Sequence, residues 1–169
     1  MIVLGIDPGT AVTGYGVVRA QGSGRAGGAD LLECGVIRTR AGEPLAARLH
    51  DIYEGVRELL ARHEPQALAV EDVFYSKNVR TTVVLGHARG VVLLAGQQAG
   101  VIIHEYSPAE IKKAVVGNGA ATKEQVQFMV TKLLRLKHAP QPADASDGVA
   151  AALTCVLSAG ILRALAAVR

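Results

Sequence analysis

Residues 1–20, MIVLGIDPGTAVTGYGVVRA, contain the clearest structural signal in the sequence. The first six residues are apolar or glycine without polar alternation, which is the pattern of a strand buried on both faces. Asp7 ends this strand, and Pro8-Gly9 supply a turn directly after it. Because an isolated carboxylate is costly to bury, we expect Asp7 either to begin the turn or to lie at a site for a metal ion or a phosphate group.

The rest of the chain predicts a mixed sheet covered by helices. Residues 14–20 and 31–38 are predicted as two further strands, which form an antiparallel meander with the first. Apolar spacing then predicts a helix over residues 44–63, a strand over 67–70, a helix over about 78–98 and a strand over 100–106. This order indicates a single α/β domain, residues 1–169. We expect a five-stranded sheet whose first three strands are antiparallel, with helices on both faces.

Capping boxes mark the starts of two later helices. Ser107 pairs with Glu110 in the first box, and Thr122 pairs with Gln125 in the second. The stretch HAPQPAD then breaks the chain before an Ala/Leu-rich final helix, which we expect over residues 143 to about 168.

Composition places the chain among ordinary globular proteins. It has 169 residues, of which 50% are hydrophobic, enough for one substantial core. No run of about 18 apolar residues predicts a membrane span, and the N-terminus lacks the basic lead-in of a signal peptide. Cys34 and Cys155 stand apart from each other and from histidine, which argues against a disulfide or a zinc site. We therefore expect a cytoplasmic protein.

The net charge of +3 conceals an uneven distribution along the chain. Residues 1–76 carry 7 Lys and Arg against 10 Asp and Glu, whereas residues 77–137 carry 9 against 3. A basic central third indicates a polyanionic partner whose backbone it grips. The plainer alternative is a solvated basic surface.

Four acidic residues stand out by position. Asp7 ends the first strand and Glu71 follows the fourth, while Asp144 and Asp147 lie three apart at the start of the last helix and share a face. If the first strand lies beside the fourth, all four carboxylates meet at one edge of the sheet. Singly, each has a plainer interpretation: a turn for Asp7, a surface strand end for Glu71, and complements to the helix dipole for the last two.

Several carboxylates within a few ångströms would repel one another and raise each other's pKa. A divalent cation removes that penalty. An all-oxygen ligand set suits Mg²⁺ or Mn²⁺ rather than zinc. The four acids together therefore predict a metal site more specifically than any one of them.

Five segments carry a resemblance to a known family. They are GIDPGTAVTGYGV (5–17), AVEDVFYSKN (69–78), LGHARGV (85–91), AVVGNGAATKEQVQ (114–127) and PADASDGVAAALT (142–154). In this order they resemble the successive motifs of the RuvC family of bacterial Holliday junction resolvases, over nearly the whole chain. The resemblance implies an RNase H-like fold, which agrees with the predicted order of strands and helices.

The resemblance also implies the chemistry. Asp7, Glu71, Asp144 and Asp147 match the family's catalytic, metal-binding acids, which implies two Mg²⁺ ions with Mn²⁺ as a substitute. Asp7, on its central strand, is expected to bridge the two ions. The implied reaction is phosphodiester hydrolysis at a four-way DNA junction, in paired symmetrical nicks that leave 5′-phosphate and 3′-hydroxyl ends. Relatives can have His at the position of Asp144, and the aspartate here keeps the ligand set all-oxygen.

Residues expected to contact DNA lie between the acids in sequence. Lys112 and Lys123 match functionally important lysines of the family, and Phe74 matches an aromatic residue that stacks on an unpaired base. A solvated lysine and a core phenylalanine are the plainer interpretations. The full set of expected DNA contacts is Phe74, Tyr75, Lys77, Arg80, Lys112, Lys113 and Lys123, and Arg89 would extend the basic track.

Partners follow from the same resemblance. The family implies a homodimer, which suits a junction of two-fold symmetry, and a branch-migration motor that resembles RuvA and RuvB. Action on chromosomal DNA implies association with the nucleoid. Gly86, Gly90 and Gly96 in the helix over 78–98 would permit close approach to the sheet or to another helix, so we expect this helix to contribute to the dimer surface.

Three other functions share some of these features. Actin-like ATPases and sugar kinases open with a similar strand and turn, but they need a duplicated domain and usually more than twice this length. A resolvase-like nuclease that acts on RNA is a second alternative, although such chains are typically shorter and lack the DVFYSKN segment. A junction-binding protein without catalysis is the third, and the intact set of acids argues against it.

Overall fold

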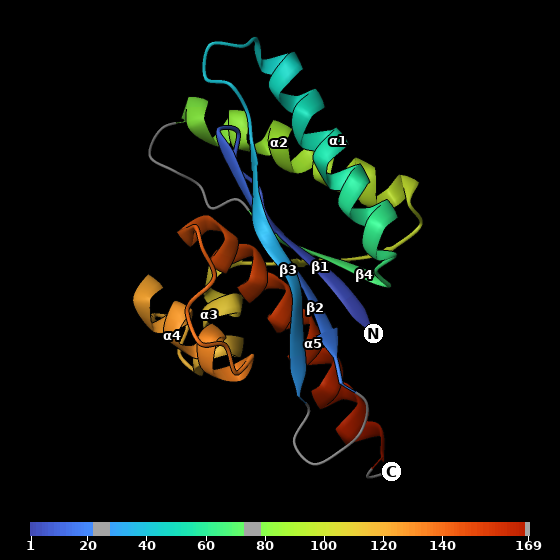
Figure 1. Ribbon diagram of the computed structural model, residues 1–169, viewed down its shortest axis with the longest axis vertical. Coiled ribbons are helices and arrows are strands. Elements are labelled where there is room, and N and C mark those ends of the chain that lie inside the picture. The colour runs from blue at the N-terminus through green and yellow to red at the C-terminus, as the bar shows by residue number, and fades with distance from the viewer. Residues whose placement is uncertain (22–27, 73–78, 168–169) are drawn as a thin grey trace.

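The computed structural model describes residues 1–21, 28–72 and 79–167. The elements in chain order are β1 (Ile2–Asp7), β2 (Val12–Ala20), β3 (Ala29–Arg38), α1 (Leu45–His63), β4 (Ala67–Glu71), α2 (Val79–Gln98), β5 (Ile102–Tyr106), α3 (Pro108–Val116), α4 (Lys123–Leu133) and α5 (Ala143–Ala167). Figure 1 shows the sheet between two groups of helices.

The five strands form one sheet in the order β3-β2-β1-β4-β5. The strand β1 pairs with β2 in antiparallel register and with β4 in parallel register, and β2 and β3 are also antiparallel. The strand β5 continues the sheet parallel to β4. The predicted antiparallel meander, and the predicted neighbourhood of the first and fourth strands, are confirmed.

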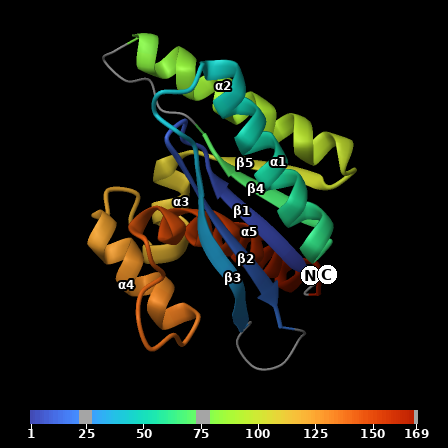
Figure 2. The same cartoon turned by 45° about the horizontal axis from the view of Figure 1, so that its top comes forward.

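Each face of the sheet packs against its own helices, as Figures 1 and 2 show. On one face, Val3 and Val18 belong to a core shared with α3, α4 and α5. On the other face, Leu4, Ile6 and Val17 belong to a core shared with α1 and α2. Successive residues of β1 thus point to opposite faces, and both faces are covered. This double burial explains why β1 lacks polar alternation.

Close packing of α5 on the sheet depends on glycines from both elements. A Cβ atom on Gly5 would lie 2.1 Å from the carbonyl oxygen of Gly148, and one on Gly148 would lie 2.5 Å from the Cα of Tyr15. No side chain fits at these crossings, so α5 lies directly on the backbone of β1 and β2. The start of α5, with Asp144 and Asp147, is thereby held against the end of β1.

Element boundaries agree with the sequence predictions to within about two residues. Both capping boxes form, at Ser107 and at Thr122. Of the glycines in α2, Gly96 packs closely against Leu68 of the sheet, whereas Gly86 and Gly90 face open space. Within the residues that the structure describes, no helix is long and apolar enough to cross a lipid bilayer.

Candidate active site

Two carboxylates lie side by side where neighbouring strands end. Ile6 of β1 is aligned with Val70 of β4, so Asp7 and Glu71 follow one residue later on adjacent parallel strands. Both strands are buried up to this point, and each carboxylate is the last residue of its strand. The sheet therefore delivers two acids to one edge, as predicted.

The first two turns of α5 bring further carboxylates to this edge. A Cβ atom on Gly14, the partner of Asp7 across the β1–β2 pair, would lie 1.9 Å from the carbonyl oxygen of Asp144. Asp147 lies about one turn later and contributes to the pocket, whereas Asp144 is not among the pocket's lining residues. The two helical acids are therefore not equivalent.

These groups line a pocket of about 330 Å³. Three carboxylates and two ammonium groups converge on it, from Asp7, Glu71, Asp147, Lys112 and Lys123. Apolar residues of α3, α4 and α5 complete the wall: Pro108, Ile111, Val126 and Ala150. A larger pocket of about 430 Å³ is lined by α1, α2 and the residues after them. Glu64 is the one carboxylate among its lining residues, so the smaller pocket is the candidate active site.

Burial and mutual repulsion make these carboxylates hard to ionise. Burial, followed by the charge of Asp147, raises the pKa of Asp7 to about 7. Burial, followed by the charges of Asp7 and Asp147, raises the pKa of Glu71 to about 8. The pKa of Asp147 is also raised, chiefly by burial, although Lys123 opposes the shift. The site is therefore short of positive charge.

Lys123 supplies part of that charge. Its Nζ lies 2.6 Å from Oδ2 of Asp147, and its charge also lowers the pKa values of Asp7 and Glu71. Lys123 is the first residue of α4, held there by the Thr122 capping box. Lys112 acts more weakly, as a charge that lowers the pKa of Glu71.

The donor atoms of the pocket carboxylates are of the kind that hard divalent cations prefer. All the candidate ligands are carboxylate oxygens, and a cation would relieve the repulsion that raises their pKa values. Across residues 1–21, 28–72 and 79–167, no three Asp, Glu, His or Cys side chains are close enough together to form a ready ligand set.

The expected DNA contacts differ in their placement. Lys112 is half-buried in the pocket wall, whereas Lys113 is exposed and lies outside the pocket lining. Arg80 is exposed in the first turn of α2. Arg89 pairs with Asp72 and Glu105, so its charge is largely neutralised. Phe74, Tyr75 and Lys77 lie outside the described residues, and their expected roles stay predictions.

Residues 3–155 match the family model for crossover junction endodeoxyribonuclease RuvC. The chain belongs to the RuvC family. A RuvC of Pelotomaculum thermopropionicum is 46% identical over 153 residues, which cover 90% of this chain and 91% of that protein. Membership of the RuvC family places the chain among the crossover junction endodeoxyribonucleases.

Solved structures of the RuvC family agree with the fold. The structure of Thermus thermophilus RuvC matches with a TM-score of 0.88 at 41% identity, over 95% of this chain and 96% of that one. The same protein in complex with a Holliday junction substrate matches with a TM-score of 0.86 at 38% identity, over the same shares. The predicted RNase H-like architecture of the RuvC family is confirmed.

Proposed function

We propose that this chain is a structure-selective endonuclease that resolves Holliday junctions by paired symmetrical nicks, in recombination and DNA repair. The observation that carries the proposal is the convergence of Asp7, Glu71 and Asp147 in one pocket beside Lys112 and Lys123. Membership of the RuvC family supports the substrate class. Residues 1–169 act as one nuclease domain.

The four acids hold the metal ions in this proposal. Asp7 lies on the central strand β1, beside the strand β4 that carries Glu71, so it would hold metal together with Glu71 and the α5 acids. Glu71, Asp144 and Asp147 complete the two ligand sets. Two bound Mg²⁺ ions, or Mn²⁺ in their place, would supply an activated water and neutralise charge on the phosphate, which leaves 5′-phosphate and 3′-hydroxyl ends.

The lysines act on the DNA rather than on the carboxylates once metal is bound. Lys112 and Lys123 flank the acids from α3 and α4, so their ammonium groups can contact the phosphate that enters the pocket. Such contacts would orient the scissile phosphate and offset charge in the transition state. Exposed Lys113 and Arg80 contact the backbone further from the cut.

In this proposal the homodimer interface lies on an exposed face of α2. The exposed residues Val79, Val83, Gly86, Gly90 and Leu94 recur at intervals of three or four along α2 and form one stripe. Val79 is 75% exposed and Leu94 is 50% exposed, while the opposite side of α2 is buried on the sheet. An α-helix with apolar residues on two opposite sides normally packs against other elements on both of them. A symmetric contact across this stripe would present two active sites to the junction.

A branch-migration motor resembling RuvA and RuvB would deliver that junction.

A synthetic mobile four-way junction tests the proposal. We expect paired nicks in opposed strands with Mg²⁺, no nicks with EDTA, and no cutting of a linear duplex of the same sequence. Binding without nicking in Mg²⁺ would support a junction-binding protein without catalysis. Preferential cutting of RNA would support the RNA-directed alternative.

A further inference from the structure

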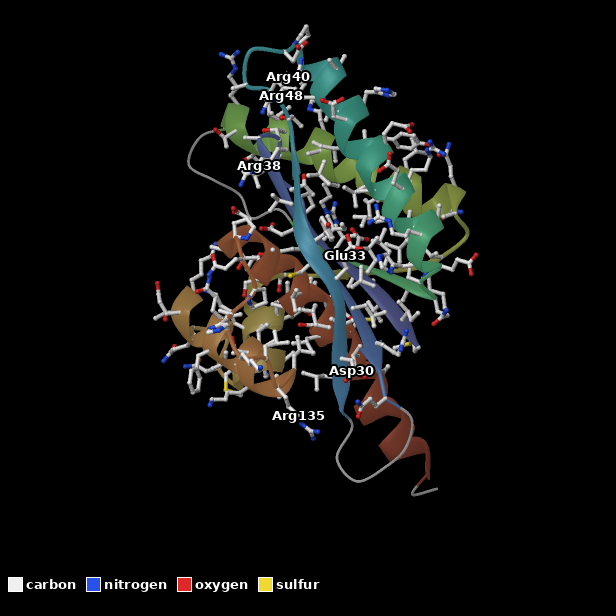
Figure 3. The ribbon with its side chains drawn as sticks, viewed as in Figure 1. Asp30, Glu33, Arg38, Arg40, Arg48 and Arg135 are labelled. Carbon is white, nitrogen blue, oxygen red and sulfur yellow. The ribbon has the colours of Figure 1, made fainter. Side chains whose placement is uncertain are left out.

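Two exposed arginines lie at the end of β3, the edge strand that is separated from β1 by β2. Arg38 is the last residue of β3 and is exposed, and the side chain of Arg40 is 88% exposed. Figure 3 shows both at the end of the molecule where β1 ends, with Glu33 and Asp30 further toward the other end. We call Arg38 and Arg40 the β3-end arginines.

Strand register places Arg38 on the same face of the sheet as Asp7. Asp7 is aligned with Gly14, and Gly14 is aligned with Val36, so these three positions share a face. Arg38 lies two residues beyond Val36 and therefore returns to that face. The first turn of α5 covers the same face at Gly14. Arg38 and the acid pocket thus flank the first turn of α5 on one face of the sheet.

The charge of the β3-end arginines is available to a ligand. Arg38 forms no ion pair within the parts of the chain that the structure describes. Arg40 has only a 4.0 Å contact with Glu43, whose side chain is 42% exposed. Exposed pairs of this kind contribute little to stability, so Arg40 loses little by exchanging Glu43 for a phosphate.

The backbone beneath these arginines is firmly held. Arg48 of α1 donates from Nη2 to the carbonyl oxygen of Thr10 at 2.6 Å and from Nε to Oγ1 of Thr39 at 3.0 Å. Thr39 also donates from its hydroxyl to the carbonyl oxygen of Thr10. These bonds fasten the residue between Arg38 and Arg40 to the turn that follows Asp7. The backbone that carries the β3-end arginines is therefore fixed relative to the turn after Asp7.

We propose that Arg38 and Arg40 bind backbone phosphates of the strand that is cut, on the β3 side of the active site. The strand β3 lies two strands from β1, which is about 10 Å at the usual strand spacing. This offset corresponds to about three nucleotides at a rise of about 3.4 Å per nucleotide. Guanidinium groups suit phosphate because two N–H groups can donate to it at once. The lysines would then contact the scissile phosphate, and the arginines would contact the backbone about three nucleotides from it. This inference rests on the proposed function.

Neutral phosphates provide the test. Junctions are prepared with a single methylphosphonate at each of the five positions on either side of the cut, and affinity is measured with Ca²⁺ for the wild-type chain, Arg38→Ala and Arg38→Ala/Arg40→Ala. Arg19→Ala is the matched control, because Arg19 is exposed at the opposite end of the sheet and on its other face.

We expect neutralisation of a phosphate about three nucleotides from the cut to weaken binding by the wild-type chain and by Arg19→Ala, but not by the double variant. The salt dependence of binding should fall by about 0.9 in log–log slope for each phosphate that a removed arginine had neutralised. An equal methylphosphonate profile and an unchanged slope in the double variant would overturn the inference. Wild-type nicking of the unmodified junction is measured alongside. If the wild-type chain does not nick the junction, the proposed function is contradicted instead. Melting temperatures equal to that of the wild type show that the variants fold.

Discussion

Lys123 of α4 places its ammonium nitrogen 2.6 Å from Oδ2 of Asp147 in α5. This pair brings a cation into a cluster whose carboxylates are raised in pKa by burial and by one another. Lys123 therefore supplies part of the positive charge that we propose a divalent ion to supply. The same side chain can either neutralise Asp147 or contact a DNA phosphate.

Replacement of Lys123 should therefore tighten metal binding to the free protein. In Lys123→Ala, Asp147 loses its competing intramolecular cation, so we expect the affinity for Mg²⁺ at pH 8 to rise by about two- to tenfold, which is up to about 1.4 kcal/mol. Isothermal titration calorimetry without DNA measures this change. Lys137→Ala is the control, because Lys137 is exposed beyond the far end of α4. Weaker Mg²⁺ binding in Lys123→Ala would mean that Lys123 supports the ion instead of competing with it.

Removal of the charge at Asp7 should stabilise the metal-free protein. Because burial and Asp147 raise the pKa of Asp7 to about 7, the folded state binds a proton more readily than the unfolded state. The contribution of this group to stability is therefore present at low pH and is lost as pH rises toward 7 and above. Asp7→Asn should raise the free energy of unfolding at pH 8 by about 1–4 kcal/mol, less the cost of any unpaired amide group. Urea denaturation in EDTA gives the value. A variant less stable than wild type at pH 8 would contradict the account.

The contribution of Glu33 to stability should depend on pH in the opposite direction to that of Asp7. Partial burial favours its neutral form, but hydrogen bonds from His63 and Tyr15 and the charge of Arg62 outweigh burial and lower the pKa of Glu33. Its stabilising contribution is present above the ordinary pKa of about 4.5 and is lost as pH falls through the lowered value.

We therefore expect Glu33→Gln to cost up to about 1 kcal/mol at pH 7, because solvent screens its partly exposed pairs, and the cost should shrink as pH falls. Urea denaturation at pH 7, 5, 4 and 3 measures the difference from wild type. Asp30→Asn is a control on the same strand, because Asp30 is exposed. A cost for Glu33→Gln that stays constant down to pH 3 would show that packing, and not charge, accounts for it.

The stripe on α2 should control association. Gly90 faces open space in the single chain, so a longer side chain fits the fold but would obstruct a second copy. We expect Gly90→Glu to shift the protein from dimer to monomer in analytical ultracentrifugation, with its melting transition retained. Phe128→Glu replaces another exposed apolar residue, 60% exposed on α4, and should leave association unchanged. A Gly90→Glu dimer as tight as wild type would place the interface elsewhere.

The sequence predicts the place of a side chain best where that place depends on a single strand or on a single helix end. Asp7 and Glu71 both follow buried strands, and parallel neighbours end at the same edge, so their meeting could be predicted. The capping boxes at Ser107 and Thr122 could be predicted for a similar reason, because each box depends only on residues three apart.

Positions that depend on packing between distant elements could not be predicted in this way. The Lys123–Asp147 pair exists because α4 packs beside α5, and nothing local specifies that contact. Lys112 and Lys113 differ only in helical phase, by about 100°, and the packing of α3 alone decides which one lines the pocket. The face on which Arg38 lies could not be predicted either, because it depends on the register of β3. A shift of one residue would turn it toward α1 and α2.

Junction nicking by Asp7→Asn in Mg²⁺, with junction affinity measured on the same preparation, shows most directly whether Asp7 is a metal ligand. If Asp7 is a metal ligand of the active site, nicking should fall by about 10³-fold or more, the range for loss of a group that stabilises the transition state. Junction affinity should stay within about threefold of wild type, because the lysines and arginines that we propose to bind phosphate are intact. Nicking at the wild-type rate by Asp7→Asn would contradict the account.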